Sequence, residues 1–142
     1  MVKRSDIVTT ARTWLGVKWQ HQGRTRNGID CAGLVDIIGE KFEQWDEQPI
    51  RDYPTRPDGT YIDHFRKHMV EKRILDAKDG DVFIFAEGTH PCHCGVRSTQ
   101  YGQPAVVHAH AKRRFVIEET LVSAESVVGQ PTHCFAFPDI ED

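Results

Sequence analysis

Hydrophobic periodicity divides this chain into two halves, and that division constrains the fold more than any other feature. In the first half, apolar residues recur about every 3.6 positions, the spacing of one helix face. After position 80, short runs rich in β-branched and aromatic residues are separated by Gly, Pro and charged residues, which is typical of strands. Helices first and strands afterwards predict an α+β fold, with N-terminal helices packed on a C-terminal antiparallel β-sheet.

Three helices are predicted in the first half. The first follows Ser5, a suitable N-cap residue, and ends near Gly16. Range 17–29 lacks periodicity and is predicted to be a loop. The second helix begins at Asp30 or Cys31, so both residues belong to its first turn. Its apolar face consists of Leu34, Val35, Ile37, Ile38 and Phe42.

A proline-rich stretch, 48–59, is predicted to cross the surface before the third helix. Thr60 with Asp63 resembles a capping box and marks the start of that helix. Its core-facing residues are expected to be Tyr61, Ile62, Phe65 and Met69. The strands of the second half are expected at 81–86, 93–97, 105–111, 115–118 and 134–137.

Length and charge limit the possible functions. The 142 residues fit one domain, 1–142, with a single hydrophobic core. A net charge of −3 argues against nucleic acid as the main partner, and the basic run 112–114 is interpreted as a solvated turn. No stretch approaches the roughly 18 apolar residues of a membrane span, so no membrane insertion is expected. The first residues lack a signal peptide's apolar core, which predicts cytoplasmic synthesis.

Cys31 is the strongest candidate for chemistry. Unpaired amides and the helix dipole stabilise a thiolate at a helix start, and its neighbours Ala32 and Gly33 are small enough to admit a substrate carbonyl. The amide of Cys31 could also donate to an oxyanion. The alternative is an inert buried thiol, a common fate of free cysteine. The other cysteines, Cys92, Cys94 and Cys134, are too unevenly spaced for a disulfide framework.

A thiol nucleophile needs a base, and the base needs an orienting partner. Strand alternation would turn His108 and His110 to one face, and a neighbouring strand could bring His93 beside them. The rival interpretation is a zinc site. The cluster His90, Cys92, His93 and Cys94 has a spacing that fits structural zinc poorly and needs a second ligand pair elsewhere.

Four motifs resemble the NlpC-type family of papain-like cell-wall cysteine peptidases. LGVKWQHQGRTRNGIDCAGLV at 15–35 resembles the family's segment around the nucleophile, and DGDVFIF at 79–85 resembles its following strand. HCGV from His93 resembles the strand of the base, and VVHA at 106–109 resembles the strand of the third residue. The motifs occur in the family's order and cover most of the chain.

The resemblance implies a function. Cys31 would be the nucleophile, His93 the base and His108 the residue that orients His93, with His110 as the alternative third residue. The substrate would be peptidoglycan stem peptides, cut between γ-D-glutamate and a diamino acid. The resemblance requires no cofactor and no metal.

Two positions depart from the family pattern. Trp19 stands where the family has tyrosine, and Ala32 replaces the serine after the nucleophile, whereas Asp30 matches. Trp19 and Asp30 are expected to contact substrate, although an Asp at a helix start also serves as an ordinary cap. His21 is either a substrate contact or a solvated loop residue.

Short segments of the chain further resemble single-domain members carried by phages and phage-like particles. They are HQG at 21–23, YPTRPDG at 53–59 and FAFP at 135–138. This resemblance implies phage tail-tip proteins as partners, and delivery to the periplasm or cell wall by a virion. The alternatives are a catalytically silent tail-assembly protein and a papain-like amidase or acyltransferase.

Overall fold

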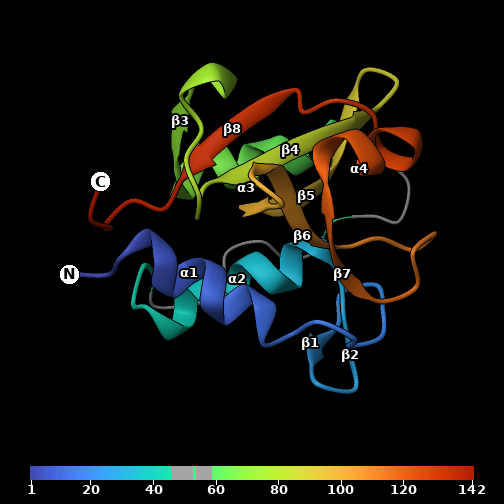
Figure 1. The fold of residues 1–142 in the computed structure, drawn as a ribbon, viewed down its shortest axis with the longest axis horizontal. Helices are drawn as coiled ribbons and strands as arrows, with labels where there is room; N and C mark the ends of the chain where they lie inside the picture. The colour runs from blue at the N-terminus through green and yellow to red at the C-terminus, as the bar shows by residue number, and fades with distance from the viewer. Residues whose placement is uncertain (46–52, 54–58) are drawn as a thin grey trace.

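The computed structural model describes residues 1–45, 53 and 59–142. Helices lie on both faces of an antiparallel sheet whose strand order is β3-β8-β4-β5-β6-β7 (Figure 1). The elements are α1 (Arg4–Arg12), β1 (Arg24–Thr25), β2 (Gly28–Ile29), α2 (Cys31–Lys41), α3 (Tyr61–His68), β3 (Val70–Lys72), the 3-10 turn η1 (Ile74–Asp76), β4 (Val82–Glu87), β5 (His90–Gln100), β6 (Gln103–Ala109), β7 (Val116–Thr120), α4 (Leu121–Val128) and β8 (His133–Ala136). The predicted α+β architecture is confirmed.

Strand alternation sorts the buried side chains of the sheet into two clusters. Val82 and Ile84 of β4 join the large cluster that contains residues of α1, α2 and α3. Phe83 and Phe85, which point the other way, join a smaller cluster with Ala124 of α4. The sheet is therefore covered on both faces, and α4 is an element that the periodicity did not predict.

The start of α2 lies where it was predicted, at Cys31. Asp30 is its N-cap, and the Asp30 carboxylate accepts a hydrogen bond from the amide of Gly33 at 2.8 Å. Gly33 has no room for a side chain, because an added Cβ would lie 2.5 Å from the carbonyl oxygen of Gly23. The hairpin β1–β2 thus packs closely against the first turn of α2.

Several predicted boundaries were wrong. α1 begins at Arg4 with Lys3 as its N-cap, so Ser5 lies inside the helix. The helix ends at Arg12, and Gly16 instead ends the following turn with a φ of 89°. The predicted loop 17–29 contains the hairpin β1–β2.

The third helix begins after Thr60 as predicted, but the Thr60 side chain makes no cap hydrogen bond, so the capping box is absent. The predicted face of this helix is buried, including Tyr61 and Phe65. Of the proline-rich stretch 48–59, only Tyr53 and Gly59 belong to the described residues. None of the helices in the described part of the chain has the length and apolar character that a membrane crossing requires.

The register of the central strands sets the positions of the two predicted histidines. β4 and β5 pair with Phe85 opposite His93, and the register then shifts so that Ala86 is opposite Pro91. Cys92 is therefore the extra residue of a bulge beside His93. β5 and β6 pair from Val96 opposite Val107 to Gln100 opposite Gln103. An added Cβ at Gly95 would lie 2.2 Å from Val106 Cγ2 and 3.0 Å from His108 Cβ, so a side chain at this position would collide with the strand that carries His108.

Candidate active site

The Cys31 thiol lies at the first residue of α2 and is 8% exposed. Its Sγ is 3.3 Å from the hydroxyl of Tyr61 on α3. Hydrogen bonding with Cys94, the charge and hydrogen bonding of His93 and the Tyr61 hydroxyl together lower the pKa of the Cys31 thiol well below its usual value, against the effect of burial. The site therefore favours the thiolate, the nucleophilic form of cysteine.

Cys94 is the partner that the sequence did not reveal. It is fully buried on β5, one residue after His93, and burial raises its pKa well above the ordinary value. Interaction with Cys31 raises it further. Cys94 therefore keeps its proton and can donate its S–H to the Cys31 thiolate.

A chain of hydrogen bonds leads away from His93. His93 Nε2 is 2.8 Å from His108 Nδ1, and His108 Nε2 is 2.8 Å from Glu119 Oε2. His108 is completely buried, and Glu119 is 8% exposed. The predicted pairing of His93 with His108 is present, and Glu119 at the end of β7 extends it.

Glu119 is held as a carboxylate. Partial burial opposes ionisation, but hydrogen bonds from His108, Ser123 and Arg113 lower the pKa of Glu119 to about 2. The Arg113 guanidinium donates to both carboxylate oxygens, at 3.1 and 2.9 Å, and the Ser123 hydroxyl donates at 2.7 Å. The third member of the chain is thus supported by β7, α4 and the 110–115 turn.

This environment fixes the protons on both rings. Burial lowers the pKa of His108, so its ring is neutral near pH 7 and carries one N–H. The Glu119 carboxylate can only accept, which places that N–H on His108 Nε2 and leaves Nδ1 as an acceptor. His93 must then donate from Nε2, so its Nδ1 lone pair is the one that can take the thiol proton. The arrangement prepares His93 as a base toward Cys31.

His110 lies beside the base without joining this chain. Its ring is 4.9 Å from that of His93, centroid to centroid, and its Nδ1 accepts from the amide of Lys112 at 3.1 Å. Burial and the neighbouring His93 and His108 rings lower the pKa of His110 to about 4. It is neutral near pH 7 and forms part of the cleft wall.

Asp30 is engaged by neighbours on all sides. Its Oδ2 accepts from the Tyr53 hydroxyl and from the Gln22 amide, and its Oδ1 accepts from the Arg24 guanidinium at 3.1 Å in addition to the helix cap. Burial and the negative charge of Cys31 raise the pKa of Asp30, while these donors oppose the rise. Asp30 is only 2% exposed, so little of its surface can contact a ligand. Its main role is to fix the start of α2.

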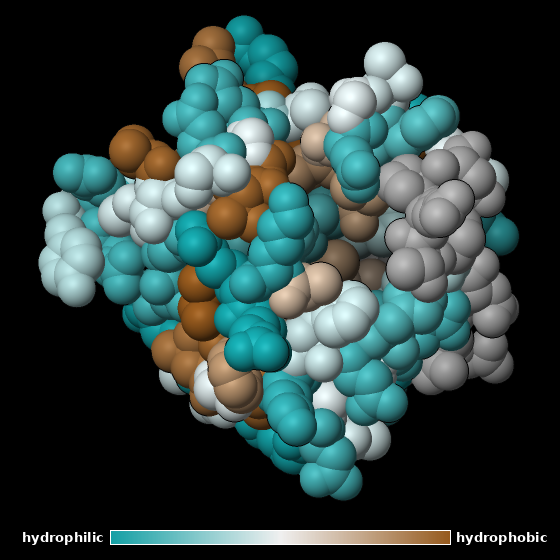
Figure 2. Space-filling view, turned by 90° about the vertical axis from the view of Figure 1, so that its right-hand side faces the viewer, coloured by the Kyte–Doolittle hydropathy of each residue, from teal (hydrophilic) through white to brown (hydrophobic). Residues whose placement is uncertain are grey.

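Three adjoining hollows form a groove past the thiol. The central hollow, of about 260 Å³, is lined by Trp19, His21, Cys31 and His93, among others. A second, of about 420 Å³, shares His93 and extends toward α4. A third, of about 430 Å³, shares Trp19 with the first. In a space-filling view of the side that carries β7 and α4, a recess with apolar atoms at its bottom is rimmed by hydrophilic atoms (Figure 2).

The predicted site residues come together as follows. Cys31, His93, Trp19 and Asp30 all line the central hollow, and His108 lies behind His93. Sequence reasoning missed Tyr53, Cys94 and Glu119, and it interpreted Tyr61 only as a core residue. Within residues 1–45, 53 and 59–142, no group of three or more His, Cys, Asp or Glu side chains is arranged to hold a metal ion.

Comparison with known proteins identifies the fold. The chain matches the NlpC/p60 domain of the peptidoglycan hydrolase SagA with a TM-score of 0.69 and 16% identity, over 95% of this chain and 99% of that one. It matches an NlpC/p60 family protein from Bacillus cereus with a TM-score of 0.72 and 16% identity, over 96% of this chain and 40% of that one.

An N-acetylmuramoyl-L-alanine amidase from Bacteroides uniformis matches with a TM-score of 0.64 and 11% identity, over 93% of this chain and 96% of the amidase. No protein-family model and no curated protein sequence matches the chain. At these identities the structural matches establish the fold. The chain has the papain-like α+β fold of NlpC/p60 domains, as its motifs predicted.

Proposed function

We propose that this chain, with its NlpC/p60 fold, is a cysteine peptidase that hydrolyses the stem peptides of bacterial cell walls. The observation that carries the proposal is the connected chain from the low-pKa thiol of Cys31 through His93 and His108 to Glu119. A thiol, a base and an orienting group in that order are what acyl transfer requires. The bond is the one between γ-D-glutamate and a diamino acid.

The reaction begins with transfer of the Cys31 proton to His93 Nδ1. The thiolate attacks the carbonyl carbon of the scissile bond, a C–S bond forms, and the amide of Cys31 donates to the oxyanion. The C–N bond then breaks as His93 gives its proton to the leaving amine. Water attacks the thioester while His93 takes its proton, and cleavage of the C–S bond restores Cys31.

Two similar structures support peptidoglycan as the substrate. SagA is described as a peptidoglycan hydrolase, and the Bacteroides uniformis protein as an N-acetylmuramoyl-L-alanine amidase. Each of these two structures aligns over almost its whole length with almost the whole of this chain. The groove beside Cys31, open at both ends of the central hollow, suits an extended peptide.

The direct test is digestion of purified muropeptides, with products identified by mass spectrometry. The protein should release fragments cut after γ-D-glutamate, and Cys31→Ala should abolish the release. Cys134→Ala is the matched control, because it removes a buried thiol from the opposite face of the sheet. Equal release by wild type and Cys31→Ala would refute the proposal.

A second candidate function is a catalytically silent protein that assembles into a phage tail. It is favoured by Trp19 and Ala32, which replace the tyrosine and serine of the family motif, and by the 8% exposure of Cys31. Co-purification with phage tail-tip proteins, together with a Cys31 thiol that is labelled no faster than an ordinary one, would support it. Fast labelling of Cys31 near pH 7 would favour catalysis.

A third candidate is an amidase or acyltransferase that uses the same groups on another acyl donor, in line with the similarity to an amidase. Product masses separate these reactions. Peptidase and amidase both incorporate one oxygen from labelled water, but they cut different bonds and so release fragments of different mass. Transfer joins the acyl group to an added amine without that label.

A further inference from the structure

The basic run 112–114 is a turn, as predicted, with Lys112 and Arg114 exposed, but its three side chains face different parts of the molecule. Lys112 lines the central hollow beside Cys31 and His93. Arg113 turns the other way and pairs with Glu119. Arg114, with a positive φ of 73°, lines the separate third hollow. Lys112 also lines the second hollow, so this short turn supplies cations to all three hollows and to the hydrogen-bonded chain.

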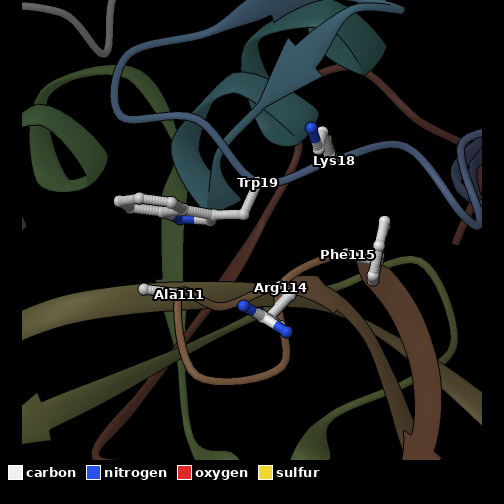
Figure 3. A pocket seen from close by; sticks show the side chains of 5 residues that line it. All are labelled: Lys18, Trp19, Ala111, Arg114 and Phe115. Carbon is white, nitrogen blue, oxygen red and sulfur yellow. The ribbon is translucent and has the colours of Figure 1, made fainter.

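The third hollow is built by two backbone segments that lie side by side. Lys18 and Phe115 form an antiparallel bridge, and the amide of Trp19 donates to the carbonyl of Arg114 at 2.8 Å. The hollow has a volume of about 430 Å³ and is lined by Lys18, Trp19, Ala111, Arg114 and Phe115. In the close-up, Lys18 and Trp19 lie on the upper segment, and Ala111, Arg114 and Phe115 lie on the part of the chain below it (Figure 3).

The lining has a consistent chemical character. It contains two cations and two aromatic rings, and no carboxylate is among the lining residues. In the described part of the chain, neither Lys18 nor Arg114 takes part in an ion pair. Phe115 is 43% exposed, so its ring is accessible to a ligand. Such a surface complements an anion carried on an apolar stem.

The hollow also continues the proposed catalytic cleft. Trp19 and Ala111 line both this hollow and the central hollow, and the central hollow adjoins Cys31 and His93. A peptide with its carbonyl at Cys31 would pass Trp19 before it reaches Lys18 and Arg114. The volume falls within the range of about 300–1,000 Å³ that is typical of ligand pockets.

We propose that the hollow formed by Lys18, Trp19, Arg114 and Phe115 is a substrate subsite for a carboxylate-bearing residue of the stem peptide. The carboxylate lies between the ammonium of Lys18 and the guanidinium of Arg114, and the stem of that residue packs on Trp19 and Phe115. The subsite rests on the proposed function, and it makes the charge of the substrate a determinant of specificity.

The test uses two soluble stem peptides that differ only in having their free side-chain and α-carboxylates present or amidated. Binding to the full-length Cys31→Ala protein is measured by calorimetry, and hydrolysis by wild type is measured in parallel. The carboxylate peptide should bind about tenfold more tightly than its amidated twin, as expected for two exposed ion pairs. Lys18→Gln/Arg114→Gln, made in the Cys31→Ala protein, should remove this preference.

Lys67→Gln is the matched control, because it removes one positive charge from α3, outside all three hollows. Equal binding of both peptides to Cys31→Ala, or a preference that survives in Lys18→Gln/Arg114→Gln, would overturn the subsite. A carboxylate preference without any hydrolysis by wild type would refute the peptidase and leave the subsite standing. Hydrolysis by wild type without a preference for the carboxylate peptide would support the peptidase and refute the subsite.

Discussion

The two sides of the catalytic cleft are held in place by different physical means. The nucleophile side is a helix start, with the Asp30 carboxylate surrounded by Tyr53, Gln22, Gly33 and Arg24. The base side is a row of side chains on three neighbouring strands, with each ring orienting the next. Changes on the first side should therefore act mainly on stability, and changes on the second mainly on proton transfer.

The largest effect is expected at the base. His93→Ala should lower kcat by about 1,000-fold with little loss of stability, because the thiol loses its proton acceptor while the strand keeps its backbone pairing. His90→Ala, which removes an exposed histidine from the same strand, should leave kcat unchanged. Comparable rates for the two variants in muropeptide hydrolysis would contradict the assignment of His93.

Glu119 provides the next test. Glu119→Ala should lower kcat by about tenfold to 100-fold, because His108 loses the acceptor that fixes its N–H.

Glu118→Ala is the matched control and should leave kcat unchanged, since Glu118 neighbours Glu119 on β7 but pairs with Arg12 and Ser98. A Glu119→Ala variant with the kcat of the wild type would contradict an orienting role for the Glu119 carboxylate.

A smaller effect is expected at Cys94. Cys94→Ala removes the thiol that donates to Cys31, so the pKa of Cys31 should rise and kcat/KM near pH 7 should fall by less than about tenfold. The rate of Cys31 alkylation, followed against pH by mass spectrometry, measures the pKa directly. Cys134→Ala truncates a thiol that is equally buried and should not move it.

On the nucleophile side, the expected change is in stability. Tyr53→Phe deprives the buried Asp30 carboxylate of a donor and should lower the free energy of unfolding by about 1.5 kcal/mol near pH 7. This loss of unfolding free energy arises from the ionised Asp30 carboxylate. It should therefore become smaller as the pH falls through the raised pKa of Asp30 and the carboxyl becomes neutral. Tyr101→Phe, at an 88% exposed residue, should change nothing in urea denaturation.

The same contrast explains what sequence could predict. The start of α2, the presence of the strands after position 80 and the convergence of Cys31, His93 and His108 follow from local periodicity and from motifs that a family shares. Glu119 could not be found that way, because its role depends on the register of β6 with β7, where it is opposite Val106 and diagonal to His108. Its signal, a charged residue just before the cap of a short helix, is common on protein surfaces.

Local sequence also misled in places where tertiary contacts decide. The sequence places Cys94 in a metal-like cluster, yet packing of α2 on β5 brings its thiol to Cys31. Tyr61 has the periodicity of a core residue and is buried like one, but its hydroxyl reaches the Cys31 sulfur. The short hairpin β1–β2 has two residues in each strand, too few to show alternation.

The central claim is that Cys31 is a thiolate nucleophile paired with His93. The most direct measurement is the pH dependence of Cys31 alkylation in the wild-type protein and in His93→Ala. Wild-type Cys31 should react as a thiolate well below the ordinary thiol pKa of about 8.5, and His93→Ala should shift the curve upward. Identical curves centred on the ordinary pKa in both proteins would contradict a thiolate paired with His93.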